Sequence, residues 1–135
     1  MSIVKHQTLK LYGEIKEQIS LPVEVKNNIV ITKVEEDELF KSKDSKALKI
    51  YYDFKSLYNN TQVEIEVKGL ILYLKKEDEA KEILDYYNKN NLLPENVMLE
   101  VGNFALIKAQ LLAISIAKDL EIQSPVMLPR MEKKQ

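Results

Sequence analysis

The sequence lacks most of the side chains on which common catalytic and metal sites depend. It has no cysteine, which excludes disulfides, thiolate zinc sites and thiol nucleophiles. His6 is the only histidine and lies where we expect a frayed end, so the sequence predicts neither a catalytic triad nor a histidine-based metal site. Gly13, Gly69 and Gly102 are isolated and form no phosphate-binding loop. We therefore predict that the protein is not an enzyme and has no catalytic residue, metal or cofactor.

The sequence also has no excess of charge of either sign. Twenty Lys and Arg residues face 21 Asp and Glu residues, so a net charge of -1 creates no strong field toward nucleic acid or an anionic membrane. Arg130 is the only arginine, although guanidinium groups make most base and phosphate contacts. The first ten residues, MSIVKHQTLK, lack the apolar core of a signal peptide. We expect a cytoplasmic protein that neither binds nucleic acid nor inserts into a membrane.

What is present is an ordinary globular composition. The 135 residues are 45% hydrophobic and 30% charged, which suits one domain with a core of its own. No repeat or Gly-rich linker divides the chain. We predict a single domain over residues 1–135, with short flexible ends at about 1–7 and 131–135.

Alternating apolar and polar residues predict four strands in the first part of the chain. Residues 9–25 form a long half-buried strand, bent at Gly13 or Pro22, and the other strands span 29–34, 48–55 and 62–74. A charged loop without periodicity covers 35–46. Asn59 and Asn60 tolerate a left-handed turn, which predicts a hairpin between the third and fourth strands. The run GLILYL at 69–74 is apolar on both faces, so this strand is expected in the centre of the sheet or under a second layer.

Two helices are expected after the strands. Residues 77–90 carry acids in the first turn and apolar residues at helical spacing. Residues 94–120 begin at Pro94, which suits a first helical position, and have an Ala- and Leu-rich interior. The order predicts an α+β fold, a four-stranded antiparallel sheet followed by two helices packed on one face.

The second helix is apolar around most of its circumference. Ile107 and Ile114 interrupt its narrow polar stripe, so the helix either packs wholly inside its own chain or is shared with a partner subunit. We expect charged residues such as Glu100 and Lys108 to prevent a membrane span. The segment after the helix has more apolar side chains than a free tail needs, which indicates a binding surface. They are Ile122, Val126, Met127, Leu128 and Met131.

The layout from about Leu9 to Met131 resembles the SecB family of export chaperones. The matching segments are the glycine and apolar run at 69–73, the Pro-Glu-Asn-Val start at 94–97, the apolar helix at 104–120, the proline-flanked tail SPVMLP at 124–129, and the Ile-Ser-Leu step at 19–21. Gln18 and Pro22 flank that step where the export chaperones carry an acidic group that helps to dock the translocation motor. Arg130 stands where family members tend to have another proline, and the tail stops before the family's last helix is complete. A translocation motor as partner stays open.

The resemblance implies a dimer of dimers, with sheets joined edge to edge and long helices between them. The residues expected at the oligomer interface are Val63, Ile65, Val67, Ile107 and Ile114. The resemblance also implies an ATP-independent holdase that binds unfolded polypeptides, with protein export as one use. The client-binding residues are expected to be the five apolar side chains of the tail. An adaptor for one partner, such as an antitoxin, is the alternative. A small-molecule binder or enzyme would need an enclosed polar pocket and carboxylate, lysine or tyrosine chemistry.

Overall fold

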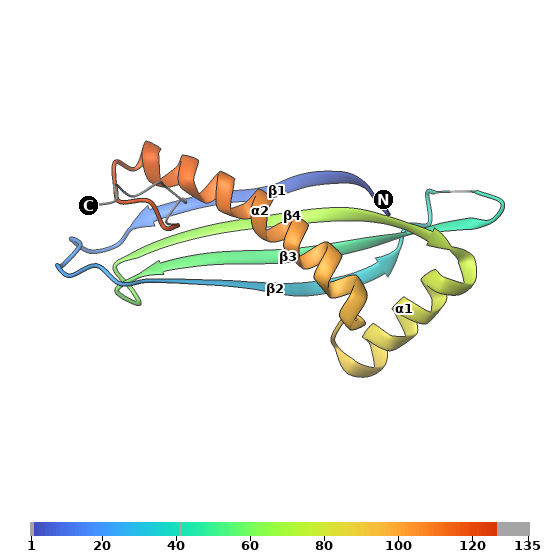
Figure 1. Cartoon of the computed structure of the whole chain (residues 1–135). Coiled ribbons are helices and arrows are strands. Elements are labelled where there is room, and N and C mark those ends of the chain that lie inside the picture. Colours follow the sequence, from blue (N-terminus) through green and yellow to red (C-terminus); the bar gives the residue numbers. More distant parts are fainter. Residues whose placement is uncertain (1, 41, 127–135) are drawn as a thin grey trace, which may run out of the picture.

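A computed structural model describes residues 2–40 and 42–126. In chain order, the elements are β1 (Ile3–Ile15), β2 (Val25–Glu36), β3 (Ser45–Tyr58), β4 (Val63–Lys76), α1 (Glu77–Asn90) and α2 (Glu95–Asp119). The four strands form one antiparallel sheet in the order β1-β4-β3-β2, and α2 lies diagonally across one of its faces (Figure 1). The predicted fold class is confirmed.

The hairpin between β3 and β4 sets the register at the centre of the sheet. Asn59 and Asn60 have φ angles of 49° and 69°, the left-handed conformation expected for this turn. Tyr58 then pairs with Val63, and the pairing continues without a shift to Ser45 and Lys76. β4 is a central strand, as the apolar run at 69–74 predicted.

The side of α2 that faces the sheet is a stripe of small residues. Val97, Val101, Ala105, Ala109, Ala113 and Ala117 recur every four residues and are all buried. This spacing places them on one face of the helix, and their small side chains allow a close approach to the strands. Opposite them lie buried aromatic and branched side chains of β3 and β4, including Tyr52, Phe54 and Ile65. The core therefore has large residues on the sheet and small residues on the helix.

α1 closes one end of this core. Ala80 and Ile83 are its buried residues, and three acids occupy its first turn, where they complement the helix dipole. Asn91 ends the helix in a left-handed conformation with φ of 57°. Pro94 then caps α2, which begins one residue later than predicted, at Glu95.

The first predicted strand is wrong in its bounds. Residues 9–25 are not one strand, because β1 ends at Ile15 and β2 begins at Val25. Pro22, which has no N–H to donate to a ladder, lies in the connection between them. Residues 3–7, expected to be a flexible end, belong to β1 and pair with β4. Residues 131–135 lie outside the described part of the chain.

α2 also bears on the expectation that the protein does not insert into a membrane. Among residues 2–40 and 42–126, α2 is the one helix long and apolar enough to cross a membrane by length and composition, with a mean hydropathy of 1.5 over an 18-residue window. The charges of α2 alone therefore do not exclude a span, although the sequence led us to expect that they would. The core helix of a soluble protein meets the same criteria, and here α2 covers a sheet. Only 28% of that window is buried within the chain, however, which leaves much apolar surface on the helix.

Candidate functional site

An apolar groove lies between β2 and the start of α2. It has a volume of about 550 Å³. Its apolar walls are Ile29 and Ile31 of β2, Tyr86 of α1, Leu92 of the connection, and Met98 and Leu99 of α2. Leu92 is 66% exposed and Leu99 is 60% exposed, so the groove opens at the surface. Among residues 2–40 and 42–126, Glu95 is the only charged residue that lines it.

The strand beside this groove has a free edge. β2 pairs with β3 on one side and has no partner strand on the other among the described residues. An unpaired edge presents N–H and C=O groups to an extended chain. Ile29 and Ile31 point toward the helix-bearing face, because their register partners Phe54 and Tyr52 are buried in the core. A polypeptide along this edge could thus bond to β2 and place side chains in the groove.

The groove was not predicted from the sequence. Its walls come from β2 and from residues 86–99, which are far apart along the chain, so no local pattern joins them. One signal was available: Leu92 and Leu93 are two large apolar residues in a short connection before Pro94. The structure buries Leu93 at 5% exposure and leaves Leu92 exposed. A pair of this kind marks a connection with one side chain in the core and one at a surface.

The outer face of α2 is a second apolar surface. Leu99, Ile107 and Leu111 are 60%, 60% and 59% exposed, and Ile114 is half-buried. Their spacing puts them on the side of the helix opposite the small-residue stripe. Of the residues predicted at an oligomer interface, Ile107 and Ile114 are therefore placed where a neighbour could contact them.

The other three predicted interface residues are placed differently. Val63, Ile65 and Val67 are 0% exposed and lie in the core of the single chain. Their side chains point to the helix-bearing face of β4, where the chain's own core covers them. In this conformation the three side chains are not accessible to a second subunit, and their expected place at an oligomer interface stays a prediction. Alternation identified a buried face but not what buries it.

The start of the tail is held against the sheet. The Tyr58 hydroxyl donates a 2.5 Å hydrogen bond to the carbonyl of Gln123, and the Asn27 amide donates one of 3.0 Å to the carbonyl of Pro125. Ile122 packs on the core, and Val126 is half-buried. These two predicted client-binding residues do not line the groove. The other three, Met127, Leu128 and Met131, lie outside the described residues.

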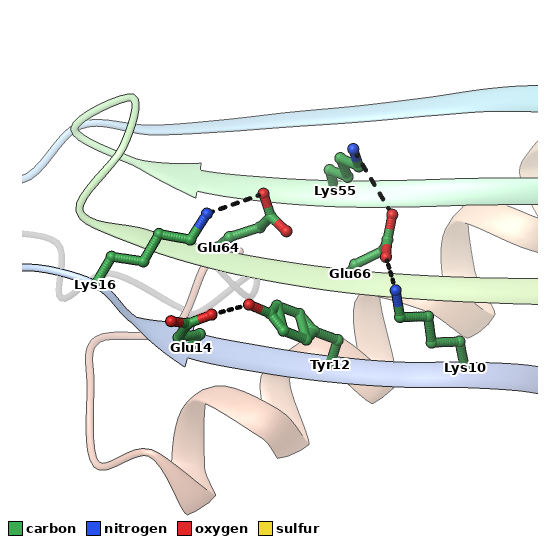
Figure 2. A network of polar contacts seen from close by, with 7 residues as sticks. All are labelled: Lys10, Tyr12, Glu14, Lys16, Lys55, Glu64 and Glu66. Atoms are coloured by element: carbon green, nitrogen blue, oxygen red, sulfur yellow. Dashed lines mark hydrogen bonds and ion pairs between the residues drawn. The ribbon is translucent and has the colours of Figure 1, made fainter.

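The sheet face away from the helices carries a polar network over β1, β3 and β4 (Figure 2). Glu66 is buried and forms ion pairs with Lys10 at 2.7 Å and Lys55 at 3.7 Å. Burial opposes its ionisation, but hydrogen bonds from Lys10 and Asp53 leave the pKa of Glu66 lowered. Burial and then the Glu66 charge raise the pKa of Asp53. These ion pairs with lysines of the neighbouring strands give Glu66 a structural role in the sheet.

His6 lies in a strand and packs against the core, although the sequence suggested a frayed end. It belongs to β1, its Nε2 lies 2.7 Å from the hydroxyl of Tyr52, and its ring stacks on that tyrosine. Burial and then the charge of Lys108 lower the pKa of His6. No group of three or more His, Asp or Glu residues in the described ranges is placed to hold a metal ion.

Comparison with known proteins gives a structural likeness only. No protein-family model matches the sequence, and no curated protein matches it. In structure, the chain is similar to the Mycobacterium tuberculosis SecB-like chaperone Rv1957, solved in complex with a ChAD peptide from the HigA1 antitoxin Rv1956. The TM-score is 0.55 at 14% sequence identity, and the match covers 98% of this chain and 91% of that chain. The four antiparallel strands followed by two helices therefore form a SecB-like fold.

Proposed function

We propose that this protein is an ATP-independent chaperone that holds unfolded polypeptides in the groove between β2 and α2. The observation that carries the proposal is the combination of an apolar groove of about 550 Å³ with the unpaired edge of β2 beside it. An unfolded segment offers both the backbone groups and the apolar side chains that such a site binds. The SecB-like fold supports a role of this class.

The binding energy would come from burial rather than from chemistry. Each client side chain that enters the groove gains about 1 to 3 kcal/mol, and the complex withdraws the client from aggregation by mass action. Met98 suits clients of varied sequence, because its thioether chain adapts to different shapes. The apolar walls and the open mouth of the groove give little support to a small-molecule enzyme, which would need an enclosed polar pocket.

We also propose that α2 packs against a second copy of the chain. Three exposed apolar side chains, Leu99, Ile107 and Leu111, form the proposed contact. β1 has no second partner strand in the part of the chain that the structure describes, which supports a further contact between sheets. Exposed apolar side chains along that strand are Val4, Leu9, Leu11 and Ile15. Both contacts together would build the dimer of dimers that the family resemblance implies.

An adaptor for one peptide is the second candidate. It is favoured by the structural neighbour, which is bound to a peptide from an antitoxin. A holdase accepts many apolar segments, whereas an adaptor binds one sequence much more tightly than its scrambled versions. The same groove would serve either role. A cytoplasmic location and a use in protein transport belong to this proposal as well, and a pull-down with a translocation motor tests the latter.

Suppression of aggregation tests the proposed function. A chemically unfolded model enzyme is diluted into buffer without nucleotide, with this protein added at stoichiometric ratios, and light scattering is followed. We expect scattering to fall as the protein is added. If scattering is unchanged at a several-fold excess, the holdase proposal is overturned. A single antitoxin-like peptide recovered at one copy per site would then favour the adaptor.

A further inference from the structure

The segment after α2 is held against β2, close to the groove. After α2, Glu121 adopts a left-handed conformation with φ of 60°, and the backbone turns back over the sheet. Two side chains of the sheet then hold it, Tyr58 through the carbonyl of Gln123 and Asn27 through that of Pro125. Pro125 is buried, so this contact is part of the folded structure. The last described residue, Val126, is thereby fixed beside the first residues of β2.

The anchor and the groove share one face of one strand. Asn27, Ile29 and Ile31 alternate along β2, so their side chains point the same way. Asn27 contacts the buried Ser56 on that face, while Ile29 and Ile31 line the groove. At about 3.3 Å per residue, the groove begins roughly 7 Å beyond the anchor and reaches Ile31 after about 13 Å. A few extended residues after Val126 span this distance.

The residues that follow have the chemistry of a groove ligand. Met127, Leu128 and Met131 are apolar, as the walls of the groove are. Arg130, the only arginine of the chain, lies between them in the sequence and has the charge to pair with Glu95, the one charged residue among the described residues of the lining. Pro125 and Pro129 favour an extended backbone, which suits a shallow open groove.

We propose that residues 127–131 occupy the groove when no client is bound, so that the tail acts as a built-in competitor. This inference rests on the proposed function of the groove. In it, the apolar tail residues bind in the groove as a client would and do not form part of the wall that contacts the client. Since the tail is tethered, its local concentration is on the order of millimolar, and even weak contacts would keep the groove mostly occupied. Client segments rich in apolar residues would displace the tail, whereas segments that bind the groove more weakly than the tail would not.

Cross-linking tests the position of the tail without any client. Because the chain has no cysteine, two introduced cysteines form the only possible pair. We would combine Leu128→Cys with Ile31→Cys in the groove, and Met131→Cys with Leu92→Cys as a second pair at a more exposed wall. The control is Leu128→Cys with Lys26→Cys, which is close to the anchor along β2 but on the opposite face. We expect the groove pairs to close within one chain at least tenfold faster than the control.

Truncation tests the competition. A chain ending at Val126 keeps the anchored segment and should bind a labelled apolar peptide about 5- to 10-fold more tightly than the full chain. Unchanged or weaker binding, equal closure of groove and control pairs, or disulfides that join two chains would each overturn the inference. If neither chain binds the peptide while the groove pairs close, the tail is placed correctly and the proposed function fails instead.

Discussion

Leu92 offers the cleanest test of the groove, because it can be changed with little effect on folding. Its side chain is 66% exposed in the free chain and would become buried under a bound client. Full burial of a leucine contributes about 1.5 to 3 kcal/mol, so the exposed two thirds would contribute about 1 to 2 kcal/mol. The change Leu92→Ser should therefore weaken binding of an unfolded peptide roughly 5- to 30-fold.

The matched control is Leu39→Ser. Leu39 is 89% exposed and lies in the connection between β2 and β3, away from the groove. Both changes replace an exposed leucine by serine, so each should leave the free energy of unfolding within about 0.5 kcal/mol of the parent. Fluorescence anisotropy with a labelled peptide measures affinity, and urea unfolding measures stability. Equal affinities for the two variants would refute the assignment of the groove as the client site.

Three further predictions concern the fold, its pH response and its assembly. Gly69→Ala should lower the free energy of unfolding in urea by roughly 1 to 3 kcal/mol, because a Cβ there would collide with a core tyrosine ring. The control Gly102→Ala, in the middle of α2, meets only the flexible end of a methionine at 3.0 Å and should be neutral or up to about 1 kcal/mol more stable. Equal losses in the two variants would contradict the close packing of β4. Burial lowers the pKa of His6, so the neutral imidazole contributes its full stability above the unfolded pKa near 6.5, and that contribution is lost as the pH falls below this value. If the melting temperature of the parent protein declines from pH 7 to pH 5 no more steeply than that of His6→Gln, this pH response is disproved. Ile107→Glu combined with Leu111→Glu should lower the solution mass measured by light scattering, while Ser115→Glu on the same helix should not, and a parent protein that is already a single chain would rule out the proposed contact.

The regular part of the fold followed from local patterns. The α2 helix and the hairpin at Asn59 and Asn60 are long or chemically distinct signals, and the structure reproduces them within a residue or two. β1 was harder to place because its pairing with β4 shifts between Thr8 and Lys10. Such a bulge breaks the strict alternation on which strand prediction depends. The alternation in residues 16–24 misled for the opposite reason, because it continues where no strand exists.

The candidate site depended on information that no local pattern contains. Alternation in β4 showed that Val63 and its neighbours are buried, but the sequence could not tell a partner subunit from the chain's own α2. The small-residue stripe that allows α2 to approach the sheet is visible as Ala at every fourth position, although its partner face is not. The groove joins β2 to residues 86–99, so only the order of strands in the sheet reveals it.

Amide hydrogen exchange with a saturating unfolded peptide tests the central claim most directly, because it shows where a client lies. We predict that the amides gaining protection belong to residues 29–31 of β2 and to residues 92–99 at the start of α2. Protection confined to the polar network on the opposite sheet face, around Lys10 and Glu66, would contradict the account, as would the absence of any peptide binding.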